Sequence, residues 1–199
     1  MCIRDRFKII GGFAGSGKTK ILHNLLDDKF AVLNLEAIAN HKGSALGAIG
    51  QDAQPSQEMF ENLLAASLIS NCNSTKHDFI FIEDESQRIG NLQIPNALWL
   101  QMRNSKVYFL DIPFNERLNY ITEEYGIHPK EQLANAIMRI QKKLGGLESK
   151  NAINFLNDDN FKDCFSILLK YYDKSYSICL LYTSPSPRDR TRSRMPSSA

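Results

Sequence analysis

The stretch FKIIGGFAGSGKT at residues 7–19 decides the fold of this chain. Residues 7–11 are a short apolar run that predicts a buried strand, and residues 18–26 predict the helix that follows it. The residues between them fit the pattern G-x-x-x-x-G-K-[ST]. Its glycines let several backbone N–H groups point at one anion, beside the positive end of the helix. The sequence therefore predicts a phosphate-binding loop (P-loop).

Side chains within and beyond this loop are expected to contact the phosphate. Lys18 adds a mobile positive charge for the outer phosphates and is a catalytic candidate. Arg88 and Arg117 lie outside the loop, and each would either clamp a phosphate oxygen through two parallel bonds or form a surface ion pair. The predicted phosphate-binding residues are Gly12, Gly15, Ser16, Gly17, Lys18, Thr19, Arg88 and Arg117.

Three acids follow another buried strand, which is predicted at residues 79–82. In P-loop proteins, an acid at the end of such a strand holds Mg²⁺ beside the loop threonine. We expect Thr19 with Glu83 or Asp84 to hold the metal, and Asp84 or Glu85 to act in catalysis. The alternative is a solvated acidic turn.

A polar segment follows the strand predicted at residues 30–35. It has no sustained period, and long loops within compact domains are usually functional or disordered. A nucleotide hydrolase does not need so many amides and hydroxyls beside its loop, whereas a site for a second, polar substrate does. His41 is also a catalytic candidate, against the alternative of a surface histidine. The predicted substrate-binding residues are Glu36, Asn40, His41, Lys42, Ser44, Gln54, Ser56 and Gln57.

The rest of the chain completes an α/β pattern. A helix is expected from Ser56, a strand at residues 107–111, and helices at 115–125, 133–144 and 161–172. This alternation predicts a P-loop NTPase-like parallel sheet with helices on both faces and a helical C-terminal part.

Composition limits the class of protein and its compartment. No apolar run approaches the roughly 20 residues of a membrane helix, and we find no secretory signal. The four cysteines show no C-x-x-C spacing, so we expect reduced thiols and a cytoplasmic location.

Both ends of the chain resemble translated sequencing-adapter DNA. We expect residues 1–6 to be such an artefact, residues 7–178 to form the P-loop domain, and residues 179–199 to be a disordered, adapter-like tail. Without residues 1–6 and 188–199, the net charge changes from +2 to −2, because six of 24 basic and two of 22 acidic residues are removed. The basicity of the whole chain is therefore no evidence for nucleic-acid binding.

Several blocks of sequence match one family. The stretches NLEAIANHKGSALG (34–47), QPSQ (54–57), IEDESQRIG (82–90) and LLKYYDKSY (168–176) resemble the C-terminal P-loop domain of bacterial tRNA 2-selenouridine synthase. The P-loop by itself is generic, whereas the first two blocks are specific.

The resemblance implies chemistry on the wobble uridine of certain tRNAs. In that family a geranyl group from geranyl diphosphate is placed on the sulfur of 2-thiouridine, and selenophosphate then exchanges the geranylated sulfur for selenium. Residues 12–19 would cradle the phosphate of either donor, although ATP or GTP binding stays open. The full-length family member also has a rhodanese domain with a reactive cysteine, which has no counterpart in this chain. The resemblance therefore implies a fragment whose partners are a 2-thiouridine tRNA and a missing rhodanese domain in cis.

Two other functions stay open. The segment Asp111-x-Pro113, followed by a helix with Arg117, also suits a small-molecule kinase of the P-loop class. A non-catalytic nucleotide-binding module is the other alternative.

Overall fold

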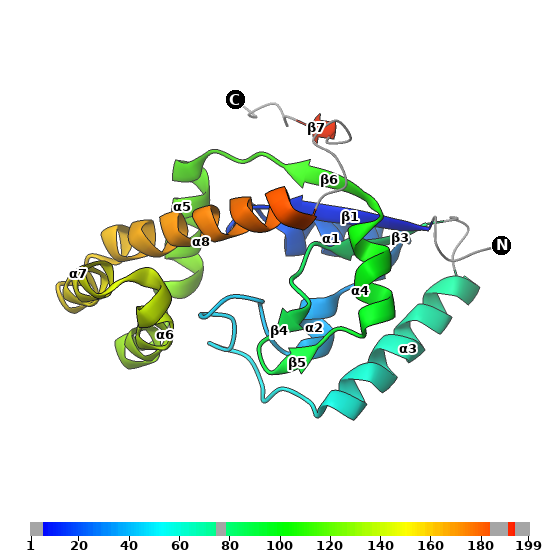
Figure 1. The fold of residues 1–199 in the computed structure, drawn as a ribbon, viewed down its shortest axis with the longest axis horizontal. Helices are drawn as coiled ribbons and strands as arrows, with labels where there is room; N and C mark the ends of the chain where they lie inside the picture. The colour runs from blue at the N-terminus through cyan, green and yellow to red at the C-terminus, as the bar shows by residue number, and fades with distance from the viewer. Residues whose placement is uncertain (1–5, 75–78, 184–190, 194–199) are drawn as a thin grey trace.

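The computed structural model describes residues 6–74, 79–183 and 191–193. Its centre is a five-stranded sheet with the strand order β2-β3-β1-β6-β7, in which all neighbouring strands are parallel (Figure 1). This confirms the predicted α/β class. The strands of the sheet are β1 (Phe7–Gly12), β2 (Ala31–Leu33), β3 (Ile80–Glu83), β6 (Lys106–Leu110) and β7 (Thr191–Ser193).

Helices and one short antiparallel hairpin surround this sheet (Figure 1). The hairpin consists of β4 (Arg88–Ile89) and β5 (Leu92–Gln93). The helices are α1 (Lys18–Asp27), α2 (Leu35–Ala39), α3 (Gln57–Ser74), α4 (Asn96–Arg103), α5 (Phe114–Tyr125), α6 (Lys130–Leu144), α7 (Gly146–Asn157) and α8 (Phe161–Thr183).

Alternating side chains of the strands bury both faces of the sheet. Successive residues of a strand point to opposite faces. Ile9 belongs to a core that includes Phe60 of α3 and Met102 of α4, whereas Ile10 belongs to a second core with Leu22 of α1. Helices therefore cover both faces, as the sequence predicts.

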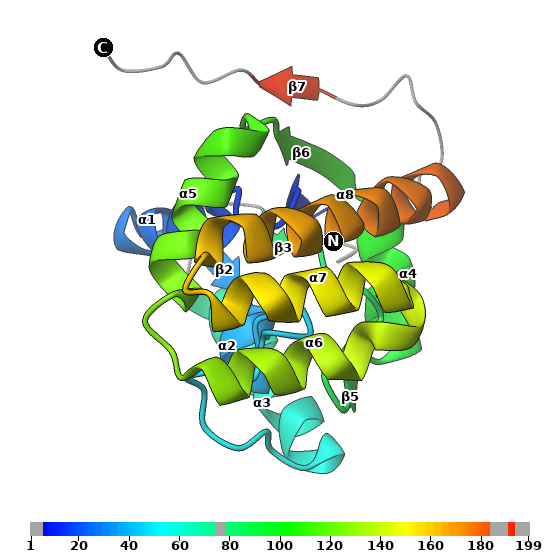
Figure 2. The same ribbon diagram turned by 90° about the vertical axis from the view of Figure 1, so that its left-hand side faces the viewer.

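The C-terminal helices form a third core beside the sheet. Figure 2 shows α6, α7 and α8 stacked side by side, with α5 next to α8. The buried face of α6 carries Leu133 and Ile137, and that of α8 carries Phe165 and Leu168. The helical periods predicted for both segments are confirmed.

Some elements differ from the sequence expectation. The second strand ends at Leu33, because the Asn34 side chain accepts a hydrogen bond from the Ala37 N–H and so caps α2. The hairpin β4–β5 and helix α4 were not predicted, since strands of two residues carry no readable period.

The expected disordered tail is partly ordered. Helix α8 continues to Thr183, and β7 pairs with β6, which supplies backbone partners to an otherwise free strand edge. The other residues after 183, and residues 1–5, lie outside the described part of the chain. Within the described residues, no helix is both long and apolar enough to cross a membrane.

Truncating Phe165 tests the importance of the helical core. Its side chain is 1% exposed and its ring lies 6.3 Å from that of Tyr125. We expect Phe165→Ala to lower the free energy of unfolding by about 3–5 kcal/mol in chemical denaturation. The control Leu147→Ala removes a 71% exposed side chain and should change it by less than about 0.5 kcal/mol. Equal effects of the two variants would contradict the assignment of this core.

Candidate functional site

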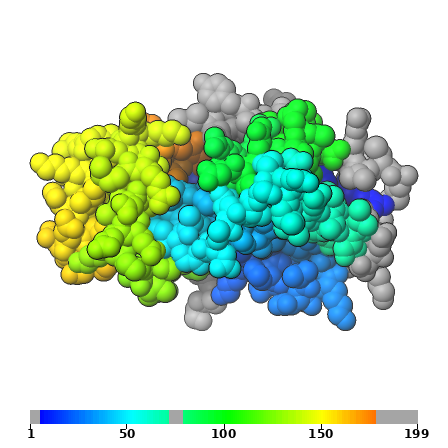
Figure 3. Space-filling view, turned by 90° about the horizontal axis from the view of Figure 1, so that it is seen from below, coloured from blue at the N-terminus to red at the C-terminus, as the bar shows by residue number. Residues whose placement is uncertain are grey.

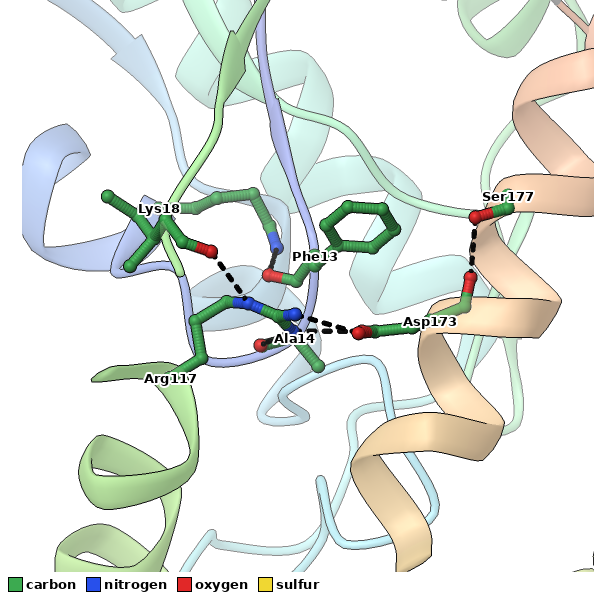
Figure 4. Close-up of polar contacts among 7 residues, drawn as sticks. Phe13, Ala14, Lys18, Arg117, Asp173 and Ser177 are labelled. Carbon is green, nitrogen blue, oxygen red and sulfur yellow. Dashed lines mark hydrogen bonds and ion pairs between the residues drawn. The ribbon is translucent and has the colours of Figure 1, made fainter. Parts of the chain in front are cut away.

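The P-loop joins β1 to α1 with the geometry of an anion cradle. Gly15 has a φ of 75°, and a Cβ there would lie 2.9 Å from the Arg117 carbonyl oxygen, so only glycine fits. The Ser16 N–H donates to the Phe13 carbonyl at 3.2 Å and closes the turn. Lys18 is folded back over the loop, where its Nζ donates to the Gly12 carbonyl at 2.9 Å. It also donates to the Phe13 carbonyl at 3.4 Å (Figure 4).

Three carboxyl groups converge beside this loop. The Thr19 hydroxyl donates to Glu36 Oε2 at 3.2 Å, and the Glu36 backbone N–H donates to Glu83 Oε1 at 2.6 Å. A side-chain hydrogen bond links Glu36 and Glu85. Because β1 and β3 are neighbours, their carboxyl ends bring the loop and these acids together. We call Glu36, Glu83 and Glu85 the acid cluster.

Burial and mutual repulsion make the acid cluster retain protons. Burial, followed by the charge of Glu36, raises the pKa of Glu83 to about 8. The same two causes hold the pKa of Glu85 well above its usual value. Burial also raises the pKa of Glu36, although the charge of Lys18 opposes this shift. A cation arriving here would favour the ionised carboxylates and so oppose these upward shifts.

The donor atoms at this place fit a hard cation. Glu83 Oε2 and Ser16 Oγ are buried without a hydrogen-bond partner in the described structure. Among the described residues, no three acidic, histidine or cysteine side chains form a ready metal cage. Mg²⁺ binds through one or two carboxylates together with substrate phosphates and water. Glu83 Oε2 and the Thr19 hydroxyl are oxygen donors of that kind.

Asp84 does not join the acid cluster. It follows Glu83 directly and therefore points to the opposite face of the sheet. There it forms an ion pair with Arg103 of α4 and accepts a hydrogen bond from the Tyr176 hydroxyl. In this structure Asp84 therefore makes structural contacts apart from the acid cluster, where a metal or catalytic role was expected. The Tyr176 hydroxyl also accepts a 3.4 Å bond from the Gly12 N–H, so this pairing anchors the start of the loop.

Arg117 of α5 supports the P-loop through contacts with the loop backbone and with α8. Its guanidinium forms two parallel bonds to Asp173 of α8, at 2.8 and 2.7 Å (Figure 4). It also donates to the carbonyls of Ala14 and Ile112, both at 3.1 Å, and the side chain is only 4% exposed. In this structure Arg117 therefore positions the loop, where a phosphate clamp was one of its two expected roles.

Arg88 lies away from the P-loop. It is the exposed residue of the hairpin strand β4 and donates from Nε to the Gly90 carbonyl at 3.1 Å. That bond holds the turn of the hairpin and leaves Arg88 outside the network of the P-loop.

Several polar residues that were expected to bind substrate instead fix the hairpin. The Gln54 side chain donates to the Ile89 carbonyl at 3.1 Å and accepts from the Asn91 N–H at 2.8 Å. The Gln57 side chain likewise donates to the Gln93 carbonyl at 2.8 Å and accepts from the Gln93 N–H at 2.9 Å. Neither side chain is therefore free for a ligand.

Two other members of that set have local structural roles. Ser56 caps α3 by accepting from the Met59 N–H at 3.2 Å, and Asn40 donates to the Ala53 carbonyl at 3.1 Å. The first bond confirms the expected start of the helix. Asn40 thus bonds within the polar segment, and Ser56 bonds to the helix that follows it.

Residues 41–43 of the polar segment lie against the acid cluster. His41 is buried, and its Nδ1 accepts from the Gly43 N–H at 3.1 Å. Burial, with a smaller contribution from the charge of Arg139, lowers the pKa of His41, so the imidazole is neutral near pH 7. A Cβ on Gly43 would lie 2.6 Å from Glu85 Oε2, which places this turn directly against the cluster.

Lys42 and Ser44 are occupied by nearby partners. Lys42 Nζ forms a 2.5 Å ion pair with Glu124 and lies over the Tyr125 ring. The Ser44 hydroxyl accepts from the Leu46 N–H at 3.2 Å. Both therefore stabilise the segment beside the cluster.

Helix α8 contributes positioning residues that the sequence did not reveal. Asp173 and Tyr176 hold the loop, and the Tyr172 hydroxyl accepts from the Ala45 N–H at 3.0 Å. The only sequence signal was a group of polar side chains in LLKYYDKSY, on a helix with an otherwise apolar face. Among the described residues, Cys164 is a buried thiol whose pKa burial raises to about 12, so it is unsuited to nucleophilic chemistry.

Comparison with known proteins gives this geometry a family. A family model described as the tRNA 2-selenouridine synthase AAA domain matches residues 5–184. The chain belongs to this family. The resemblance carried by the sequence blocks is thereby confirmed.

Curated relatives agree with that assignment. A tRNA 2-selenouridine synthase from Shewanella frigidimarina is 32% identical over 216 residues, which cover 94% of this chain and 56% of the relative. Synthases from Hydrogenovibrio crunogenus and Nitrosomonas europaea are 31% and 37% identical, over 84% and 61% of this chain and 51% and 32% of their own lengths. The chain thus spans about half the length of the first relative.

One solved structure has a weaker likeness. The crystal structure of TT1252 from Thermus thermophilus is 15% identical, with a TM-score of 0.35, over 65% of this chain and 78% of that protein. At that level it carries no argument about function.

The buried Glu83 predicts a pH-dependent stability. A carboxyl whose pKa rises from 4.5 to about 8 on folding holds its proton more tightly when folded, so stability falls as pH rises through that window. Glu83→Gln removes this titration. In metal-free buffer, its stability relative to the unaltered chain should increase by up to about 1.4 kcal/mol per pH unit across the window. Denaturant titrations at several pH values measure this, and a constant difference would contradict it.

The Arg117–Asp173 pair predicts a large effect for one conservative change. Asp173→Asn leaves a nearly buried guanidinium without its counter-charge, so we expect the free energy of unfolding to fall by about 3 kcal/mol. Asp159→Asn is the matched control, because Asp159 is 71% exposed in its pair with Lys130 and should lose less than about 1 kcal/mol. Chemical denaturation of both variants compares them, and similar losses would count against a supporting role for Arg117.

Proposed function

We propose that this chain binds the phosphorylated donor in the modification of the tRNA wobble uridine, as one part of a tRNA 2-selenouridine synthase. One observation carries the proposal: in a member of this family, the P-loop, Lys18 and the acid cluster meet at the carboxyl ends of β1 and β3. The donors would be geranyl diphosphate and selenophosphate. Both carry phosphate, and an anion cradle at a helix end binds phosphate whatever is attached to it.

The loop would hold the donor in place for attack. Backbone N–H groups of the loop would surround the phosphate, and Lys18 Nζ would leave the carbonyls of Gly12 and Phe13 to reach a phosphate oxygen. In geranylation, the uridine sulfur forms a bond to the geranyl carbon while the bond from that carbon to the diphosphate oxygen breaks. The electron pair of that bond leaves with the diphosphate, and the N3 proton of the thiouracil ring passes to solvent. The protein would contribute in two ways: it would position the donor, and it would stabilise the leaving diphosphate.

The acid cluster would complete the donor site. Thr19 and Glu83 would hold Mg²⁺, which, when bound, supplies positive charge beside the leaving phosphate. Because burial raises the pKa of Glu85, this carboxyl would exchange a proton with the bound phosphate. Glu36 bonds Thr19 and Glu83, and would keep both oriented. His41, which is neutral and lies behind Gly43, would fix the turn that carries this wall of the site.

The remaining steps would need parts beyond this chain. We propose that a rhodanese domain in cis and a tRNA with a 2-thiouridine wobble base are its partners, and that the full enzyme acts in the cytoplasm, where such tRNAs are found. ATP or GTP would fit the same cradle and would compete with the donor for it in a binding assay.

Replacement of Lys18 tests the donor site. We expect Lys18→Ala to weaken binding of geranyl diphosphate to this chain at least about tenfold, because a charge-assisted contact is lost. In the full-length enzyme the same change should abolish geranyl transfer. Lys20→Ala is the matched control, since Lys20 is exposed on the same helix. Isothermal titration calorimetry measures the affinity, with circular dichroism as the check on folding.

Two results would contradict the proposal. One is unchanged donor affinity and unchanged geranylation with Lys18→Ala. The other is steady turnover of ATP or GTP with a small acceptor and no effect of thiouridine tRNA, which would indicate a P-loop kinase.

A further inference from the structure

A cleft lies outside the P-loop, between residues 48–51 and helix α6. Its volume is about 510 Å³, within the range of ligand sites. Figure 3 shows the cyan part of the chain that contains residues 48–51 beside the yellow-green α6. On the helix side the cleft is lined by Gln132, Asn135 and Arg139, which follow one another at the spacing of successive helical turns, and by His128 just before the helix.

The polar groups of this cleft are available to a ligand. Within the described part of the chain, the side-chain amides of Gln132 and Asn135 make no hydrogen bond. Arg139 donates from Nε to the Asn135 carbonyl at 3.4 Å, and its guanidinium has no acidic partner among the described residues. No carboxylate lines the cleft. It therefore presents one fixed positive charge and groups that both donate and accept hydrogen bonds.

Packing holds the opposite wall of the cleft, residues 48–51, in place. Ile49 is 4% exposed and packs into the core of helices α5–α8 with Leu46. Gly50 has a φ of 70°, and a Cβ there would lie 2.7 Å from Cε1 of His128, so the backbone runs close against the imidazole ring. The ring also lies 6.2 Å from that of Tyr125. The shape of the cleft is thus set by packing.

The cleft is connected to the acid cluster through adjacent groups. Arg139 is near enough for its charge to act on His41. His41 in turn accepts the bond from the Gly43 N–H, and Gly43 abuts Glu85. A molecule seated against Arg139 would thus lie on the same side of the protein as the donor site.

The chemistry of the lining selects a class of ligand. Side-chain amides match the donor and acceptor edges of a nucleobase, a guanidinium binds a phosphate, and a half-exposed imidazole offers a stacking face. We propose that this cleft binds an unpaired nucleotide of the RNA substrate, with its phosphate on Arg139 and its base between His128 and the amides of Gln132 and Asn135. This inference rests on the proposed function, since that function supplies the RNA.

A second polar cleft, of about 430 Å³, lies beside the hairpin and is less suited to this task. The Gln57 amide in it is already bonded to Gln93 and Glu61, and Glu61 would repel a phosphate. The observations therefore favour the cleft at α6.

Replacement of Arg139 tests the inference. The ligand is a short anticodon stem–loop RNA with a 2-thiouridine wobble base, and its affinity for the chain is measured by fluorescence anisotropy at several salt concentrations. We expect Arg139→Gln to weaken binding about tenfold and to reduce the slope of log affinity against log salt by about one, because one phosphate contact is lost. Lys143→Gln is the matched control, since it removes one positive charge from an exposed position of the same helix outside the cleft.

A second variant tests the base contacts. Gln132→Ala combined with Asn135→Ala should weaken binding about tenfold and leave the salt slope unchanged, because no charge is removed. Both side chains are exposed, so the fold should tolerate these changes.

The outcomes separate this inference from the proposed function. If Arg139→Gln binds the RNA as tightly as Lys143→Gln, and with the same salt slope, the nucleotide cleft is overturned while the donor site stands. If the unaltered chain does not bind the RNA at all, the cleft is overturned as well, and binding of geranyl diphosphate still decides the donor site on its own.

Discussion

The ion pair between Arg117 and Asp173 is the interaction on which the site depends. It joins α5 to α8, and the same guanidinium donates to the carbonyl of Ala14 within the P-loop. The C-terminal helices therefore do more than form the third core. Together with the contact between Tyr176 and Gly12, they set the shape of the loop from the side away from the ligand. A cradle of backbone N–H groups is useful only when it is held in one conformation.

The acid cluster adds a second constraint on the other side of the loop. Three carboxyl groups share a buried space beside one lysine, and their raised pKa values express the cost of ionising all of them. Entry of a cation with a phosphate ligand would lower that cost. Under the proposed function, the site would thus be more stable with its ligands than without them.

The sequence predicted the parts of the structure that depend on local patterns. The P-loop, the four main strands and the faces of α6 and α8 follow from apolar periodicity and from glycines at fixed spacing. The roles of Asp84 and Arg117 could not be read in this way, because their partners, Tyr176 and Asp173, are 92 and 56 residues away along the chain. The amide of Gln54 was likewise indistinguishable from a substrate ligand until the hairpin that it holds was visible.

A crystal structure of the chain with geranyl diphosphate tests the central claim most directly. The account predicts a diphosphate within hydrogen-bond distance of the backbone N–H groups of residues 15–19, with Lys18 Nζ moved from the carbonyls of Gly12 and Phe13 onto a phosphate oxygen. A diphosphate bound elsewhere, with Lys18 still on those carbonyls, would contradict it.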